Sequence, residues 1–242
     1  MLGSGGGCYE SARNLAFGRM VSLFDTSARE FARSTDHSIA AGRYVRGDMF
    51  VRAAKQWIRR GGRVLDFGCG PGRLARFIAQ EGYSVVGVDP SSEMIDEASR
   101  QPIGGPEIRF VVGPDVSAVD SEGPFAGAIC SSVIEYERDP MSLLRGLHAT
   151  LEPHAALILS YANARSMWRT YARLRNPNAP YLKYQHQVWT WCDCTRHLQA
   201  AGFEIVDGPR FFESPFDRWA SLVRLSSMST IGTLGLVVAR RS

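Results

Sequence analysis

The pattern of apolar and polar positions changes period near residue 60. Before that point, apolar residues recur at helical spacing, as at Phe17, Met20, Val21 and Phe24, and this spacing predicts helices over 14–57. After it, short continuous apolar runs alternate with helical segments. Continuous apolar runs indicate strands buried on both faces, so the pattern favours a mostly parallel sheet covered by helices on both sides.

Seven strands are predicted from the apolar runs, over 63–67, 84–89, 108–112, 125–130, 156–161, 203–206 and 231–240. Helices are predicted over 74–81, 92–100 and 140–151, and another begins after Thr190 and stops at Gly202. The predicted fold class is therefore α/β, with a doubly wound, mostly parallel seven-stranded sheet and helices on both faces.

The domain organisation follows from length and local composition. A chain of 242 residues with 45% apolar and 21% charged residues has the size and balance of one globular domain. The glycine-rich residues 1–15 are expected to be disordered, 16–60 to form an N-terminal helical lid, and 61–242 to form the main domain. Residues 163–189 are rich in Arg, Asn, Pro and aromatic side chains without a clear period, and we interpret them as a substrate-cap insertion.

Charge and cysteine content narrow the environment and the partners. The net charge is +4, but the 28 basic residues are almost all arginine and are dispersed, so they do not form the basic stripe of a nucleic-acid-binding face. Five irregularly spaced cysteines do not resemble a disulfide framework. Neither an apolar leader nor a run of 18 apolar residues is present, so we expect a cytoplasmic protein with no membrane or nucleic-acid partner, as a monomer or homodimer.

The most informative segment is the glycine-rich loop between the first predicted strand and the helix after it. From Asp66 to Gly72 it reads Asp-Phe-Gly-Cys-Gly-Pro-Gly. Glycines at such a turn let the backbone approach a ligand closely. The dinucleotide fingerprint requires a glycine where Arg73 stands, and a phosphate-binding loop requires a Gly-Lys pair that is absent, so both alternatives fail.

Five further segments follow the loop in order. They are Asp89 at the end of the next strand, 113–116, 128–136, 151–156 and 200–204. Together with the acidic-x-Gly-x-Gly-x-Gly loop, they resemble the motifs of class I S-adenosylmethionine-dependent methyltransferases, especially the bacterial type used in quinone, sugar and natural-product methylation. The chain departs from that pattern at Ala126, Tyr136, and His154-Ala155.

The resemblance implies a Rossmann-like methyltransferase fold, with S-adenosylmethionine as the cofactor and S-adenosylhomocysteine as its product. The implied cofactor-binding residues are Tyr44, Arg46, Asp66, Gly68, Gly70, Asp89, Pro90, Met94, Asp115, Val116 and Ser131. Asp89 is expected to hold the ribose, and Asp115 and Val116 the adenine edge. Tyr44 and Arg46 are expected to clamp the cofactor carboxylate, although Arg46 is equally consistent with a solvated helix residue.

The chemistry asks little of the protein, because a sulfonium is already an activated methyl donor and positioning dominates. A base is needed only where the nucleophile carries a proton. His186 is the first candidate for that base, with a loop histidine bonded to backbone as the alternative interpretation; Glu135 and Tyr136 also compete. Tyr136 and Tyr161 are expected to face the acceptor substrate.

A metal site is not expected. Cys192 and Cys194 point about 200° apart on a helix and cannot converge on one ion.

The resemblance implies methyl transfer to an oxygen or nitrogen of a small molecule, such as a natural product, sugar or quinone-like compound. Two alternatives remain: a methyltransferase acting on tRNA or protein, and a non-catalytic binding subunit that kept the fold.

Overall fold

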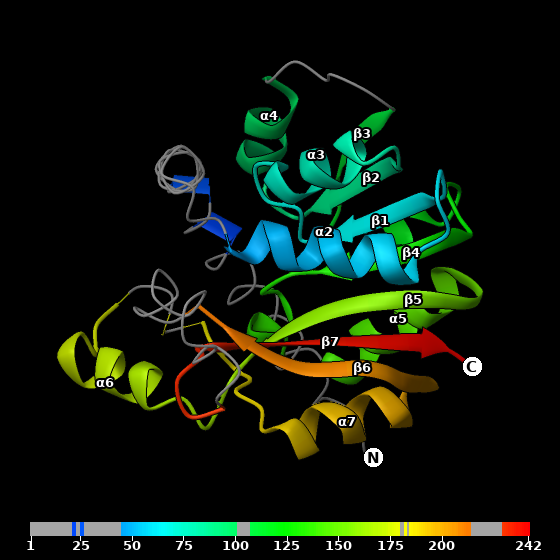
Figure 1. Ribbon diagram of the computed structural model, residues 1–242. Helices are drawn as coiled ribbons and strands as arrows, with labels where there is room; N and C mark the ends of the chain where they lie inside the picture. The colour runs from blue at the N-terminus through cyan, green and yellow to red at the C-terminus, as the bar shows by residue number, and fades with distance from the viewer. Residues whose placement is uncertain are drawn as a thin grey trace, which may run out of the picture.

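The computed structural model describes residues 21–22, 25–26, 45–100, 107–179, 182, 184–213 and 229–242. Its sheet has seven strands in the order β3-β2-β1-β4-β5-β7-β6 (Figure 1). They are β1 (Arg63–Phe67), β2 (Ser84–Asp89), β3 (Ile108–Val112), β4 (Phe125–Cys130), β5 (Leu151–Ala162), β6 (Phe203–Phe212) and β7 (Leu234–Arg241). Only β7 runs antiparallel to its neighbours within this sheet, which confirms the predicted mostly parallel arrangement.

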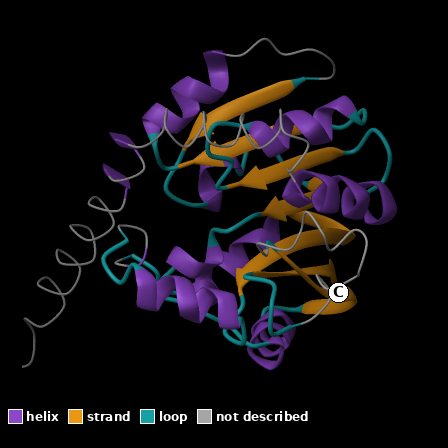
Figure 2. Ribbon diagram, turned by 60° about the vertical axis from the view of Figure 1, so that its left-hand side comes forward, coloured by secondary structure: helices purple, strands orange, loops and turns teal. Residues whose placement is uncertain are grey.

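Helices lie on both sides of the sheet (Figure 2). The main ones are α2 (Val45–Trp57), α3 (Arg73–Gln80), α4 (Ser92–Arg100), α5 (Pro140–Thr150), α6 (Met167–Arg175) and α7 (Trp191–Ala200). One core cluster joins α2 and α3 to the sheet through side chains such as Phe50 and Ile78. The other joins α5 and α7 to the opposite face through Leu144 and Leu198. The continuous apolar runs are therefore explained by burial on both faces.

The first four strands have the predicted bounds, and three later elements differ. β5 begins at Leu151 instead of 156, because the expected turn is continuous strand with His154 at φ +63°. β6 continues to Phe212, paired along β7. The helix α6 was not predicted, because none of its residues is buried and it carries no apolar stripe facing a core.

Parts of the predicted organisation lie outside the described residues. The predicted disorder of 1–15 and most of the predicted 16–60 lid fall there. Within the described part of the chain, no helix is long and apolar enough to cross a membrane.

The strand order determines where a ligand can bind. β1 pairs with β2 on one side and with β4 on the other. The strand order therefore runs from β1 to β3 in one direction and from β4 onward in the other, and it reverses between β1 and β4. In doubly wound sheets, the carboxyl ends of strands at such a reversal border a crevice that binds ligands. The glycine loop follows β1 at this point.

Candidate functional site

A pocket of about 450 Å³ opens at the carboxyl ends of β1, β2 and β4. The glycine loop, the start of the loop after β2 and residues 131–133 after β4 form one end of it. The other end is formed by Arg46 at the start of α2, one face of α6, and residues beside β6 and β7. The sheet edge and α6 are far apart in sequence, so only the folded chain brings these two ends together.

Two glycines of the loop line the pocket in backbone conformations that other residues avoid. Gly68 has φ +71° and Gly70 has φ +52°. A Cβ at Gly68 would lie 2.2 Å from Cγ2 of Val133, which also lines the pocket. The Gly70 N–H donates to Asp89 Oδ2 at 2.9 Å, so the loop is tied to the end of β2.

Asp89 lies in the pocket beside Pro90 and Met94. Its two carboxylate oxygens accept backbone N–H groups, Oδ2 from Gly70 and Oδ1 from Ser91 at 3.0 Å. Burial raises the pKa of Asp89, and these two hydrogen bonds oppose that effect. A carboxylate has about four acceptor positions, so two backbone bonds orient it and leave capacity for ligand hydroxyls.

Asp66 lies under the loop and is not among the residues that line the pocket. Its carboxyl is buried, and Oδ2 has no hydrogen-bond partner among the described residues. Burial raises its pKa to about 7, with a further contribution from the charge of Asp89. Asp66 Oδ2 is hydrated in the unfolded chain and loses that hydration when it is buried. A hydrogen-bond donor next to the loop would therefore stabilise it.

The segment after β4 contributes Ser131, as predicted, and also Ser132, which the sequence did not single out. Ser132 has φ +56°, a left-handed conformation that is uncommon for a residue other than glycine. Its N–H donates to Oγ of Ser160 at 2.9 Å, and this bond to β5 holds the turn. The hydroxyls of Ser131 and Ser132 are buried without a partner among the described residues.

The residues expected at the adenine edge stand beside the pocket. Pro114 lines it, whereas Asp115 is exposed and its Oδ1 accepts the N–H of Ser117 at 2.9 Å. Val116 is buried in the core.

Glu137 also lines the pocket. Burial raises the pKa of its carboxyl to about 7, and the charges of Asp139 and Asp115 add to this rise.

Glu135 is the buried carboxyl at the other end of the pocket. It is 4% exposed, and its Oε2 has no hydrogen-bond partner within the described part of the chain. Burial raises its pKa to about 7, although the charges of Arg46 and Arg169 lower it. A carboxyl with a pKa near 7 that reaches a pocket can accept a proton at neutral pH.

Of the three other residues predicted on the substrate side, only one lines the pocket. Tyr136 lines the pocket. His186 does not: its side chain is exposed, and its backbone N–H donates to the Glu135 carbonyl at 2.7 Å. This hydrogen bond belongs to the His186 backbone and does not involve its imidazole. Tyr161 does not reach the pocket either, because it is fully buried in the core with its ring 6.4 Å from that of Trp189.

Arg46 lines the pocket and is not a solvated helix residue. It forms an ion pair with Glu213, at 2.6 Å from Nη2 to Oε1 and 2.8 Å from Nε to the same oxygen. Glu213 is 167 positions away in the chain, and no sequence signal pointed to it. Tyr44, the other half of the expected clamp, lies outside the described residues.

One wall of the pocket comes from α6, through Trp168, Arg169, Ala172 and Arg173. The segment containing α6 had no periodicity, but its composition of arginine and aromatic residues is what the pocket uses. The predicted substrate-cap insertion thus includes a helix that borders the pocket.

The cysteine pair on α7 is divided between core and solvent. Cys194 is buried with Leu198, and Cys192 is exposed, as their angular separation predicts. Thr190 and Asp193 form the capping box that begins the helix. No cluster of three His, Cys, Asp or Glu side chains suited to a metal ion occurs within the described ranges.

Comparisons with known proteins agree with this geometry. The model of a methyltransferase domain family matches residues 41–207. A ubiquinone biosynthesis O-methyltransferase from Xanthomonas axonopodis pv. citri is 27% identical over 190 residues, which span 74% of this chain and 76% of that protein. An N-demethylindolmycin N-methyltransferase from Streptomyces griseus is 31% identical over 167 residues, or 59% of this chain and 70% of that one.

A solved structure shares the fold. It is the 1,6-didemethyltoxoflavin-N1-methyltransferase of Burkholderia thailandensis, with a TM-score of 0.63 and 22% identity, covering 100% of this chain and 93% of that one. Because the family model matches more than half of the chain, the chain belongs to the methyltransferase domain family. It is a class I S-adenosylmethionine-dependent methyltransferase.

The residues present fit that cofactor. Gly70 has no Cβ in a left-handed loop that lines the pocket, and only the Met94 sulfur, at 4.0 Å, would approach a Cβ placed there. Asp89 is oriented by two backbone bonds with acceptor capacity remaining. The unpartnered oxygens of Asp66 and Ser131 supply polar groups near the same loop.

Proposed function

We propose that this enzyme transfers a methyl group to an oxygen or nitrogen of a small-molecule acceptor. The observation that carries the proposal is one pocket in which the glycine loop and Asp89 occupy one end and the buried carboxyl of Glu135 occupies the other. When bound, S-adenosylmethionine supplies an activated methyl on a positively charged sulfur.

The chain's own residues hold and orient the cofactor at the first end. Asp89 accepts the ribose hydroxyls, and Met94 and Pro90 cover the adenine. The backbone at Gly68 and Gly70 would hold the methionine part, and the carbonyl of Ser131 would accept a hydrogen bond from its ammonium group. These contacts would fix the direction from which the acceptor must approach, and alignment supplies much of the rate in such displacements.

Glu135 takes the acceptor proton in this proposal, and His186 does not, because the His186 side chain is exposed outside the pocket. The ionised Glu135 Oε2, with no partner among the described residues, accepts the proton from an acceptor hydroxyl or amine. Arg46 and Arg169 lie near enough to lower the Glu135 pKa, so they stabilise the carboxylate form that does this.

A small-molecule acceptor is supported by the relatives. The ubiquinone and indolmycin enzymes are named for O- and N-methylation of small molecules. Asp25 lies next to the end of β2, because Ser91 Oγ donates to Asp25 Oδ1 at 2.5 Å.

The test separates cofactor binding from methyl transfer. Titration calorimetry of the full chain with S-adenosylmethionine is expected to show one site, weakened in Asp89→Ala. A panel of small hydroxyl and amine compounds, screened for S-adenosylhomocysteine release, is expected to yield acceptors for the wild type and slow turnover in Glu135→Gln. Absence of cofactor binding would overturn the proposal. Binding without release from any acceptor would favour a non-catalytic subunit instead.

A further inference from the structure

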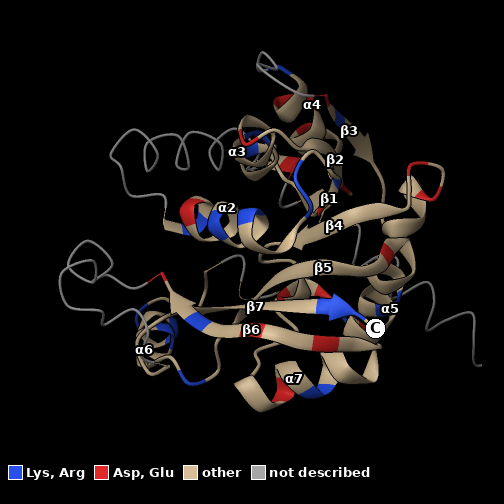
Figure 3. Cartoon of the chain, turned by 45° about the vertical axis from the view of Figure 1, so that its right-hand side comes forward, with Lys and Arg blue, Asp and Glu red and all other residues tan. Residues whose placement is uncertain are grey.

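The helix α6 turns charged side chains into the pocket. Arg169 and Arg173 are four residues apart, so they lie one turn from each other on the same face. Trp168 and Ala172 flank them with the same spacing. Arginine positions are prominent on this helix (Figure 3). The pocket wall is therefore built from two guanidinium groups beside an aromatic ring.

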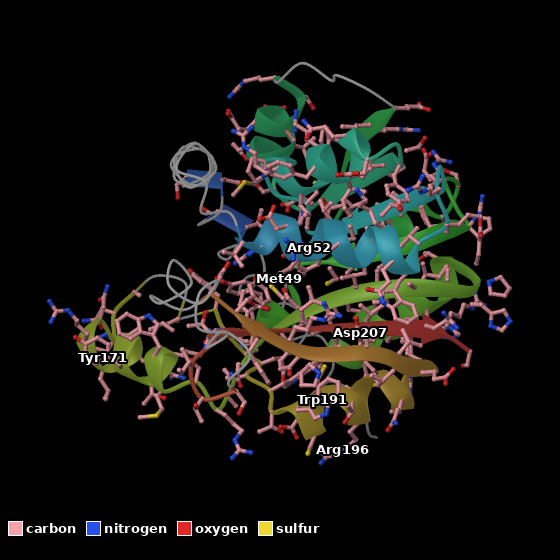
Figure 4. All side chains as sticks on the ribbon, in the orientation of Figure 1. Met49, Arg52, Tyr171, Trp191, Arg196 and Asp207 are labelled. Atoms are coloured by element: carbon pink, nitrogen blue, oxygen red, sulfur yellow. The ribbon has the colours of Figure 1, made fainter. Side chains whose placement is uncertain are left out.

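The opposite face of α6 is apolar and faces solvent. Met167 is 72% exposed, Tyr171 48% and Leu174 79%. Tyr171 lies on α6 at the edge of the molecule, away from the sheet (Figure 4). Helices normally turn their apolar stripe toward the core, and exposing such side chains is unfavourable. The orientation of α6 therefore gives up apolar burial in order to place arginines in the pocket.

The orientation of α6 is fixed by hydrogen bonds at its start. Ser166 caps the helix by accepting the Arg169 N–H at 3.2 Å, and its hydroxyl donates to the Ile231 carbonyl at 3.1 Å. The Met167 N–H donates to the Thr230 carbonyl at 2.9 Å. These bonds to the segment before β7 prevent the helix from rotating to bury its other face.

Among the described residues, three arginines and two carboxyls line this end of the pocket. They are Arg46, Arg169 and Arg173, with Glu135 and Glu213. The Arg46 guanidinium is already paired with Glu213. Arg173 lines the pocket, and it makes no hydrogen bond or ion pair with any described residue. A ligand group of negative charge would complete this arrangement.

We propose that the acceptor is an aromatic compound bearing an oxyacid group, a carboxylate or a phosphate, held by Arg173 with Arg169. The guanidinium fork matches the oxygens of either group in two parallel hydrogen bonds. Trp168, fixed by a ring contact of 5.1 Å with Tyr171, offers a flat face to the aromatic part. This inference rests on the proposed function, because it names the acceptor class of the same pocket.

The test measures acid recognition in the full chain without cofactor. Benzoate, phenyl phosphate and the neutral benzamide are titrated separately by ligand-observed NMR. At least one acid is expected to bind about tenfold tighter than benzamide, with a preference that weakens as salt rises. The stronger of the two acids identifies carboxylate or phosphate as the natural group.

Substitutions at α6 assign the effect to one side chain. Arg173→Met is expected to remove the preference for acid over benzamide, and Arg173→Lys to keep part of it. Arg175→Met is the matched control, because Arg175 lies on the same helix, is exposed and does not line the pocket. Its preference is expected to equal that of the wild type.

Several outcomes overturn the inference: benzamide binding as tightly as both acids, neither acid binding at millimolar concentrations, or an undiminished preference in Arg173→Met. Cofactor titration of the same preparation keeps the two proposals apart. Cofactor binding without acid preference refutes only the acceptor class. Acid preference without cofactor binding refutes the proposed function.

Discussion

The substitution Glu135→Gln is expected to stabilise the protein at alkaline pH while it slows methyl transfer. The carboxyl is 4% exposed, and burial raises its pKa from 4.5 to about 7. A difference of this size between folded and unfolded chains corresponds to roughly 3 kcal/mol of unfolding free energy. Ionised Glu135 therefore destabilises the folded state, because its charge is buried.

The sign depends on pH in a defined way. At pH values below 4.5 the group is protonated in both states and contributes no pH dependence. Between 4.5 and about 7 the unfolded chain ionises while the folded chain keeps its proton, so wild-type stability falls as pH rises. Glutamine does not titrate. The stabilisation by Glu135→Gln should therefore be roughly 2–3 kcal/mol greater at pH 8 than at pH 5.

Thermal unfolding at the two pH values measures this difference, which corresponds to roughly 5–10 °C in Tm for a chain of this size. Exposed Glu107, replaced by glutamine, is the control and should show no such pH dependence. With an acceptor from the screen, the wild-type rate should rise through about pH 7, and Glu135→Gln should lose roughly 10²–10⁴ in kcat. A pH-independent effect on Tm, or a wild-type rate in the variant, would refute the reasoning.

Three further substitutions test other parts of the site. Asp89→Ala should weaken S-adenosylmethionine binding about tenfold or more by calorimetry while unfolding stays cooperative, and unchanged affinity would contradict the ribose assignment. Gly68→Ala should lose roughly 2 kcal/mol or more in urea unfolding, because its Cβ would lie 2.2 Å from Val133 Cγ2 at φ +71°. Gly82→Ala is the control, because Gly82 has φ +91° but no atom lies within 4 Å of an added Cβ, so only backbone strain is introduced there. An equal loss of stability in the two variants would contradict the proposed clash with Val133. His186→Ala should keep kcat within about threefold, since the side chain is exposed; a much larger loss would make His186 the base.

The central sheet and the cofactor end of the pocket were accessible to sequence reasoning. Parallel strands buried on both faces must be apolar throughout, so β1 to β4 are visible as continuous runs. The glycine loop is visible for a similar reason: Gly68 and Gly70 adopt positive φ, which few other residues tolerate. Both signals are local, because each residue type reflects its own backbone or burial.

The acceptor end was decided only by tertiary structure. Glu213 forms its ion pair with Arg46 from 167 positions away in the chain. Glu135 and His186 lie side by side through a backbone hydrogen bond, but only Glu135 lines the pocket. The helix α6 has no buried residue, and its short apolar face points to solvent, so its sequence does not show the apolar stripe of a helix that packs on a core. Local sequence records the conformation and burial of each residue, whereas burial of a charge and convergence of distant side chains depend on how the elements pack. For this enzyme, the sequence therefore determined the glycine loop that lines one end of the pocket, and packing determined which side chains line the other end.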